Sequence, residues 1–304
     1  MSPLKHDVII GSRASALARW QTGWVVSRLY EAWADLKIHV EYFSTAGDRV
    51  AGRPLPEFGG KGVFTDDLAQ ALLEKKIDIA VHSLKDLPVD ESPGLAVGAI
   101  GERADAHDVL VAAAPCTLQS LPERARVGTS SLRRAAQLLA TRPDLTILPI
   151  RGNVDTRIRK ALNGDYDAIV LAAAGLERLG LTEHIVEILS FERMLPAPGQ
   201  GALALQCRAD EAFCLDNLYP LDHLPTRRAV TAERAFLQAL GGGCSAPIGA
   251  YAEADGEGLT LSGVVAALDG HRMVRVSAEG SDPQQLGADL AREALAQGAG
   301  TLLP

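Results

Sequence analysis

The chain has 304 residues, 47% of them hydrophobic, with 30 Lys and Arg against 38 Asp and Glu. This composition is that of a folded soluble protein rather than a disordered one. The formal net charge of −8 argues against nucleic-acid binding over the whole surface, because such binding requires phosphate neutralisation. No apolar run reaches the roughly 20 residues of a membrane span, and the N-terminus shows no signal-peptide core. We therefore expect a cytoplasmic protein of two or three domains, with no nucleic acid or membrane partner.

The first two thirds of the chain alternate short β-branched runs with amphipathic helices. This pattern is typical of α/β domains built on mostly parallel sheets. A first domain is expected to have strands at 7–10, 37–43, 78–81 and 95–100, a helix from the turn 11–15 to about residue 30, and a helix from Thr65 to about residue 76. The glycine-rich segment 44–62 predicts a mobile loop, with a lid as one interpretation.

After a predicted hinge at 101–107 the pattern restarts as a second α/β domain. Its expected strands are 108–113, 126–128, 145–150 and 168–171, and its expected helices are 130–141, 154–163 and 175–179. A second crossing is expected at 197–201, and the strand 202–207 is expected to return to the first domain. The domains are thus predicted as 1–101 with 202–219, 106–196, and 224–304.

The C-terminal domain changes character to a small α+β unit. It is expected to contain a helix at 226–240, a glycine run at 241–243, three strands within 248–278 and a final helix near 285–297. The cysteines (Cys116, Cys207, Cys214 and Cys244) form no C-x-x-C pair, so neither a zinc site nor a disulfide framework is predicted.

Positive charge is concentrated in one part of this acidic chain. The stretch from Arg124 to Lys160 contains eight arginines and one lysine, and its acidic residues are only Asp144 and Asp155. The planar guanidinium binds carboxylate or phosphate through two points, so this bias suits a ligand with several fixed anions. Surface solubility remains the alternative for any single arginine.

Two predicted helix starts combine glycine, hydroxyl groups and arginine. These are Gly128–Arg134 (G-T-S-S-L-R-R) in the second domain and Gly11–Ser15 (G-S-R-A-S) in the first. Helix N-termini at the carboxyl ends of strands offer backbone amides to anions, although simple helix capping explains each one equally well. The run Gly59–Gly62 (G-G-K-G) does not fit a nucleotide-binding P-loop.

Two further features are candidates for chemistry. The turn after the strand at 78–81 contains Lys85 and Asp86, where a carboxylate beside cations can stabilise a developing cation, or simply form a solvated ion pair. Cys244 follows three glycines, which would let a bulky group approach its sulfur, or it is a buried thiol after a helix end.

Four segments in order resemble the porphobilinogen deaminase (hydroxymethylbilane synthase) family. They are Val81–Pro88 (V-H-S-L-K-D-L-P), Val127–Arg134 (V-G-T-S-S-L-R-R), Leu148–Arg157 (L-P-I-R-G-N-V-D-T-R), and Ala232–Phe236 (A-E-R-A-F) together with Gly242–Cys244. The resemblance runs from about Val8 into the C-terminal domain. It implies two domains similar to type II periplasmic binding proteins, with a cleft between them, and a small C-terminal α+β domain.

The resemblance also implies a transferase of porphyrin and heme biosynthesis that acts as a monomer. Porphobilinogen molecules would be deaminated and joined head to tail onto a dipyrromethane cofactor held by a thioether at Cys244. After four additions, water would release the linear tetrapyrrole hydroxymethylbilane. Each pyrrole bears acetate and propionate groups, so the growing chain is a polyanion that suits an arginine-rich site.

The family's functional positions carry over to residues of this chain. Asp86 matches the catalytic aspartate. The implied cofactor-binding residues are Cys244, Lys85, Ser83, Thr129, Ser131, Arg133, Arg134, Asn153 and Arg157, and the implied substrate-binding residues are Arg13, Ser15, Lys61, Arg151, Arg178 and Gln200. No metal is implied.

The chain departs from the family pattern at a few positions. Gly241 stands where E-G-G-C has glutamate, Asp66 and Asp67 replace a lysine-glutamate pair, and Glu57 occupies a position that is often basic. These changes concern the expected lid and the segment before the cysteine. Asp86, Cys244 and the arginines are retained.

Two other classes of protein remain as alternatives. Two α/β lobes with a hinge also suit a non-catalytic binding protein for a small anion. A cysteine-nucleophile hydrolase would need a histidine base for Cys244, for which His223 and His271 are the nearby candidates in the sequence.

Overall fold

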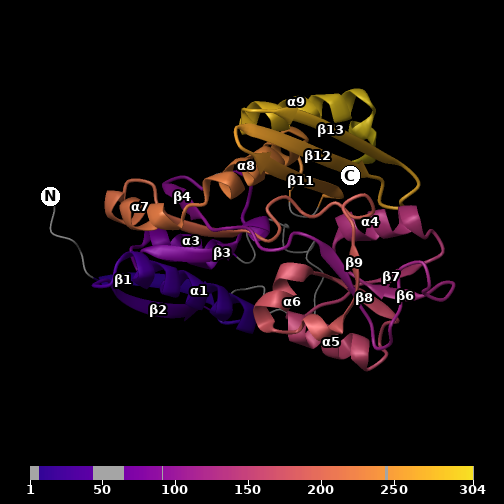
Figure 1. The fold of residues 1–304 in the computed structure, drawn as a ribbon, viewed down its shortest axis with the longest axis horizontal. Coiled ribbons are helices and arrows are strands. Elements are labelled where there is room, and N and C mark those ends of the chain that lie inside the picture. Colours follow the sequence, from indigo (N-terminus) through magenta and orange to yellow (C-terminus); the bar gives the residue numbers. More distant parts are fainter. Residues whose placement is uncertain (1–6, 44–64, 91, 244–245, 304) are drawn as a thin grey trace. The chain divides into compact units, whose positions relative to one another are not determined.

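The computed structural model describes residues 7–43, 65–90, 92–243 and 246–303 (Figure 1). The chain divides into two compact units, Met1–Arg103 with Ala202–Arg227, and Ala104–Gly201 with Arg228–Pro304. The predicted loop at 44–62 lies outside the described residues. None of the helices in the described ranges is both long and apolar enough to cross a bilayer.

The first unit is built on a five-stranded sheet with the order β2-β1-β3-β10-β4. Its strands are β1 (Asp7–Arg13), β2 (Lys37–Phe43), β3 (Ile79–Ser83), β4 (Leu95–Ile100) and β10 (Leu203–Arg208), and its helices are α1 (Ala16–Ala32), α3 (Asp66–Leu73) and α7 (Ala212–Leu218). Strand β1 is parallel to both β2 and β3, whereas β10 is antiparallel to β3 and β4.

Strand β10 joins this sheet from a distant part of the sequence. Leu205 on β10 lies opposite Val81 on β3 and Ala99 on β4. This pairing confirms the expectation that the strand predicted at 202–207 returns to the first sheet. Because β10 enters the sheet without a crossover helix from β3 or β4, its direction is not constrained to be parallel. The expected mostly parallel sheet is therefore a mixed one.

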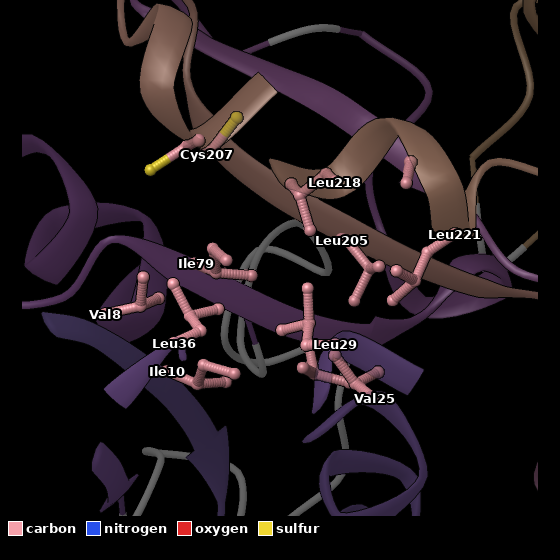
Figure 2. Packing of buried hydrophobic residues seen from close by; sticks show 13 residues of the cluster. Val8, Ile10, Val25, Leu29, Leu36, Ile79, Leu205, Cys207, Leu218 and Leu221 are labelled. Atoms are coloured by element: carbon pink, nitrogen blue, oxygen red, sulfur yellow. The ribbon is translucent and has the colours of Figure 1, made fainter. Parts of the chain in front are cut away.

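One core cluster of the first unit lies between its sheet and the helices α1 and α7. Figure 2 shows Val25 and Leu29 of α1 side by side, in the same cluster as Val8 and Ile10 of β1. Leu29 is fully buried, and its spacing from Val25 places both on one side of α1. Leu218 of α7 belongs to the same cluster, so one core unites the N-terminal elements with the returning segment.

The second unit contains a second five-stranded sheet with the order β7-β6-β8-β5-β9. Its strands are β5 (Asp108–Val111), β6 (Arg126–Gly128), β7 (Thr146–Leu148), β8 (Ala168–Ala172) and β9 (Ile185–Leu189), and its helices are α4 (Leu132–Thr141), α5 (Val154–Leu162) and α6 (Ala173–Leu179). This sheet repeats the mixed pattern, with β6 parallel to β7 and β8, and β5 antiparallel to β8 and β9.

The C-terminal part of this unit is an antiparallel three-stranded sheet with helices. It consists of β11 (Ile248–Asp255), β12 (Gly258–Ala266) and β13 (Met273–Gly280), with α9 (Pro283–Ala296) packed against β12 and β13. Helix α8 (Leu224–Ala239) precedes these strands. The α/β class with a small C-terminal α+β region is confirmed. The predicted division into three domains with the stated boundaries stays a prediction.

Several element boundaries differ from the predictions. Strand β3 continues through Ser83 and is followed by a 3-10 turn, Leu84–Asp86, so the expected polar turn begins later. Thr65 stands at the start of α3 but makes no side-chain capping bond, and α3 ends at Leu73 rather than near residue 76. Strand β9 and helix α7 were not expected, because each is short and only partly buried and so lacks a clear periodic pattern.

Arg208 of β10 connects this strand to the end of α3, to the residues just before β3 and to the residue just before α7. Its guanidinium donates to the carbonyl oxygens of Leu72 and Ile77 and to the carboxylates of Asp78 and Glu211. The Arg208 side chain is 6% exposed and that of Asp78 is 13% exposed. The ion pair is therefore largely removed from water. Loss of one partner in such a place leaves the other charge poorly solvated.

We predict that Arg208→Met destabilises the first unit by about 3–5 kcal/mol, because it leaves Asp78 without its cation. Arg28→Met is the control, since the Arg28–Glu31 pair is more than half exposed and should contribute at most about 1 kcal/mol. Urea denaturation followed by circular dichroism measures both. Equal midpoints for the two variants would contradict the assignment.

Candidate active site and arginine cluster

The first unit has a pocket at the carboxyl ends of its parallel strands. Arg13 ends β1 and Ser83 ends β3, and because these strands are parallel neighbours, their ends meet at one edge of the sheet. Ser15 is the N-cap of α1, where its hydroxyl accepts a hydrogen bond from the Ala18 amide. The lining residues are Arg13, Ser15, Leu17, Ala18, Gln21, Thr65, Val81, His82, Ser83 and Asp86.

Asp86 reaches this pocket from the 3-10 turn that follows β3. The turn is held by the Leu84 amide, which donates to the carbonyl of Ala202, and by the Leu87 amide, which donates to the Leu84 carbonyl. The Asp86 side chain is exposed, whereas Leu84 within the same turn is 1% exposed and anchors it to the core. A solvent-accessible carboxylate thus stands on a hydrogen-bonded turn, in a pocket whose lining also includes Arg13.

Gln21 is a lining residue that the sequence did not reveal. It is buried on α1, and its Nε2 donates to Oγ of Ser83 at 2.9 Å. The neighbouring Thr22 is also buried and donates to Oγ of Ser12 at 2.6 Å. The available signal was that Gln21 and Thr22 lie on the side of α1 that also carries the buried Val25 and Leu29. Buried polar groups need specific partners, so polar residues at such positions indicate a specific contact.

His82 lines the same pocket and is also buried. Burial lowers the pKa of His82 to about 4, although the neighbouring Gln206 side chain partly opposes this, and the positive charge of Arg13 lowers it further. Among the described residues, Nε2 of His82 and Oε1 of Gln206 lack a hydrogen bond of ordinary geometry. The imidazole is therefore neutral near pH 7.

The second unit brings its predicted helix start to the carboxyl end of β6. Helix α4 begins at Leu132 rather than at residue 130, and the Ser131 hydroxyl caps it by accepting from the Arg134 amide. Thr129 Oγ1 accepts from the Ser131 amide at 3.1 Å, and Ser130 Oγ donates to the Ile150 carbonyl at 2.8 Å. Thr129 and Ser131 thus order the loop through their own side chains.

Arg133 and Arg134 do not extend into solvent but share one buried carboxylate. Nη1 of Arg133 lies 2.7 Å from Oδ2 of Asp108, and Nη2 of Arg134 lies 2.7 Å from Oδ1. Asp108 is fully buried, while Arg133 and Arg134 are 4% and 7% exposed. Asp108 was absent from the sequence-based site, because nothing in its local sequence distinguishes it from an ordinary residue at the start of a strand.

Charge and burial compete at this cluster. Burial by itself would raise the pKa of Asp108, but the adjacent Arg133 and Arg134 guanidiniums hold it well below its usual range. Burial lowers the pKa of Arg133 from its ordinary value despite the attraction of Asp108. Two guanidiniums and one carboxylate leave an excess of positive charge in a site with little water, which favours an anionic ligand.

Gln200 contacts the same cluster, and Arg178 contacts the backbone of the residue that follows Gln200. Gln200 Nε2 donates to Oδ1 of Asp108 at 2.9 Å and to the Ala106 carbonyl at 2.8 Å. Arg178 Nη2 donates to the Gly201 carbonyl at 2.6 Å, and burial lowers the pKa of Arg178 to about 10, with Glu177 opposing the shift. Gln200 belongs to the segment from Leu195 to Gly201, and Arg178 contacts the end of that segment.

The remaining predicted arginines lie at the start of α5. Arg157 Nε donates to the Gly152 carbonyl at 2.7 Å, and the Arg151 carbonyl accepts from Nζ of Lys160 at 3.2 Å. Asn153 is the N-cap residue of α5, exposed and without a side-chain capping bond.

The other predicted site residues divide between described and undescribed parts of the chain. Lys85 lies in the 3-10 turn with Asp86. Lys61, Glu57 and Cys244 lie outside the described residues. Within the described ranges, no three His, Cys, Asp or Glu side chains gather as they would around a metal ion.

Two of the departures from the family pattern have a local physical context. Gly241 has a φ of +67°, and a Cβ added there would meet nothing within 4 Å. The left-handed backbone therefore favours glycine, while space for a side chain exists. Asp66 and Asp67 occupy the first turn of α3, where the helix dipole favours negative charge. Burial, and then the charge of Asp67, raise the pKa of Asp66.

Comparison with known proteins defines the class of this fold and site. A family model described as "Porphobilinogen deaminase, dipyromethane cofactor binding domain" matches residues 8–216, and its C-terminal domain model matches residues 227–296. Together these matches span both units. The chain belongs to the porphobilinogen deaminase family.

Curated relatives agree over nearly the full length. The porphobilinogen deaminase of Carboxydothermus hydrogenoformans is 48% identical over 302 residues, which cover 99% of this chain and 97% of the relative. The porphobilinogen deaminase of Roseiflexus sp. is 50% identical over 302 residues, covering 99% of each chain. That of Brevibacillus brevis is 49% identical over 297 residues, 97% of this chain and 96% of the relative.

Solved structures of another kind are also similar, but only weakly. The methionine binding protein MetQ has a TM-score of 0.45 at 12% identity, covering 74% of this chain and 91% of that chain. The periplasmic VFT2 domain of Bordetella pertussis BvgS has a TM-score of 0.44 at 15% identity, covering 71% of this chain and 86% of that chain. These values are too low to support an argument, so the fold rests on the sheet topology above.

The lowered pKa of His82 predicts a pH-dependent stability. Between about pH 6.5 and pH 4, an unfolded histidine binds a proton that the folded one does not, so stability falls as the pH drops through this window. Wild-type protein should lose about 2 kcal/mol of unfolding free energy at about pH 5 through this residue.

His82→Gln should remove this loss, and urea titrations at about pH 7.5 and about pH 5 measure it. His39→Gln is the control, because His39 is exposed on β2 of the same unit. The same dependence on pH in the His82 variant and the wild type would rule out the buried neutral imidazole.

Proposed function

We propose that this chain catalyses the porphobilinogen deaminase reaction, the stepwise joining of four porphobilinogen molecules and hydrolytic release of hydroxymethylbilane. The observation that carries the proposal is the pocket of the first unit, where the Asp86 carboxylate lies among lining groups that include Arg13, Ser15 and Ser83. The family assignment over both units supports the same activity.

Asp86 is proposed as the catalytic residue. Porphobilinogen loses ammonia when its aminomethyl C–N bond breaks, which requires a proton on the departing nitrogen and leaves a cationic methylenepyrrolenine. A nearby carboxylate stabilises that cation and assists the proton transfers. The free α-carbon of a second pyrrole then attacks the methylene carbon, and loss of its proton restores aromaticity, so each addition releases one ammonia.

The cationic and hydrogen-bonding residues are proposed to hold the pyrrole acetates and propionates. In the first unit Arg13 and Ser15 would bind substrate carboxylates at the N-terminus of α1, where backbone amides favour anions. We assign substrate binding to Arg13, Ser15, Lys61, Arg151, Arg178 and Gln200, and cofactor binding to Lys85, Ser83, Thr129, Ser131, Arg133, Arg134, Asn153 and Arg157.

The arginine cluster fits a dipyrromethane by its chemistry. Two guanidiniums meet a single carboxylate, Asp108, which leaves positive charge for the carboxylates of such a group. To the described residues, Arg133 donates only through Nη1, so its Nε and Nη2 are the donors we assign to a pyrrole carboxylate. When bound, the dipyrromethane supplies the pyrrole carbon to which the first substrate is joined. We propose that Cys244 holds it through a thioether.

Location and assembly follow the same proposal. We propose that the protein is a cytoplasmic monomer that acts on a small-molecule substrate. We propose no nucleic-acid or membrane partner.

Asp86→Asn should lower turnover at least about 100-fold, because the neutral amide cannot stabilise a cation. The variant should keep its fold and its covalent pyrroles, as measured by circular dichroism and intact mass. Asp90→Asn is the control, an exposed carboxylate close by that does not line the pocket. Normal turnover of the Asp86 variant would refute the catalytic role.

The intact mass of the purified protein should exceed that of the bare chain by a two-pyrrole unit, with peptide mapping placing the excess at Cys244. Cys244→Ser should remove the excess, and Cys116→Ser, at a partly exposed thiol, should retain it. If wild-type protein gains no mass even after incubation with porphobilinogen, the proposed function fails and an anion-binding protein becomes the better account.

A further inference from the structure

The segment from Leu195 to Gly201 connects two parts of the second unit. On one side, the Leu195 carbonyl accepts from Nη1 of Arg133 at 2.6 Å, and Gln200 Nε2 donates to Asp108. On the other side, the Pro196 carbonyl accepts from the Ala250 amide of β11 at 3.0 Å. The segment is therefore fixed between the arginine cluster and the C-terminal sheet.

A fully buried carboxylate on α8 holds the middle of this segment. Oε2 of Glu233 accepts from the Gly199 amide at 2.7 Å, and Oε1 accepts from the Ala252 amide of β11 at 2.8 Å. Gly199 has a φ of +78°, a conformation that only glycine adopts easily. The Gly199 amide that donates to Glu233 therefore belongs to a backbone turn that other residues would strain. Neither the sequence motifs nor the proposed chemistry assigns Glu233 a role.

The residue after Gly199 carries this constraint to the arginines. Gln200 donates to Oδ1 of Asp108, the same oxygen that accepts from Nε and Nη2 of Arg134. Oδ2 of the same carboxylate accepts from Arg133. Since these donors share one carboxylate, its rotation, together with the Leu195 and Val170 carbonyls, sets the directions of the two guanidiniums. Gln200 helps to set that rotation.

We propose that Glu233 is a positioning residue for ligand binding, which fixes the directions of Arg133 and Arg134 through Gly199, Gln200 and Asp108. This inference rests on the proposed function of these arginines as binders of pyrrole carboxylates. Bidentate guanidinium binding depends on direction as well as charge. Glu233 therefore acts on affinity from α8, the helix that precedes the glycine run and Cys244 in the chain.

The test is Glu233→Gln, which keeps the side-chain volume but presents one oxygen and one NH₂ to two backbone N–H donors. One of those buried donors loses its acceptor. We expect KM for porphobilinogen to rise about tenfold with a smaller change in kcat, and apo protein incubated with porphobilinogen to gain pyrrole mass more slowly. Glu253→Gln is the matched control, an exposed glutamate on the same strand as Ala252.

A double-mutant cycle separates positioning from general destabilisation. Gln200→Ala should raise KM at least as much, and the double variant should show little more than the Gln200→Ala effect, because Glu233 acts on the arginines through Gln200 and Asp108. The effects on thermal stability should instead add. Arginine-selective ¹⁵N spectra supply a readout without turnover, in which the Nε–H signal of Arg134 should shift in Glu233→Gln and not in Glu253→Gln.

The proposal is overturned if Glu233→Gln changes KM less than twofold, if the two KM effects multiply in the double variant, or if the Arg134 signal is unmoved. Should Glu233→Gln fail to fold, Glu233→Asp, which keeps the charge but is one methylene shorter, takes its place in the cycle under the same criteria. Failure of the proposed function is distinguishable, since wild-type protein would then gain no pyrrole mass at all.

Discussion

The second unit depends on one carboxylate that pairs with two buried guanidiniums. Asp108 begins β5 and lies against Arg133 and Arg134 at the start of α4. Removing charges from water is costly, and only close pairing with further hydrogen bonds makes such burial tolerable. Gln200, the Leu195 carbonyl and the Val170 carbonyl supply those bonds. The order of this region and its excess of positive charge thus have the same origin.

The first unit meets a different requirement, the support of an accessible carboxylate. Asp86 is exposed, but it stands between Leu84 and Leu87, which are both buried, on a turn bonded to Ala202. The residue that leads into β10 therefore contributes to the site, although no residue of β10 lines the pocket. A catalytic group gains from such rigidity because its geometry need not reorganise during the reaction.

Much of the fold and part of the site could be predicted from residue pattern alone. The alternation of β-branched runs and amphipathic helices predicted the α/β units, and glycine and hydroxyl residues before Arg133 predicted a helix start close to the observed one. The residue pattern did not predict the antiparallel direction of β10, and the predicted length of α3 was wrong, because tertiary partners decide both. Asp108, Gln21 and His82 were not identified because burial and pairing give them their properties, and neither is a local feature of sequence.

The sequence by itself determined the family, the class of fold and the excess of arginine between Arg124 and Lys160, because motifs, periodicity and charge are properties of neighbouring residues. Only the tertiary structure decided that Arg133 and Arg134 share Asp108 and that Glu233 holds the backbone beside Gln200. These contacts join residues far apart in the chain. Their strength comes from exclusion of water, which exists only after the elements have packed together.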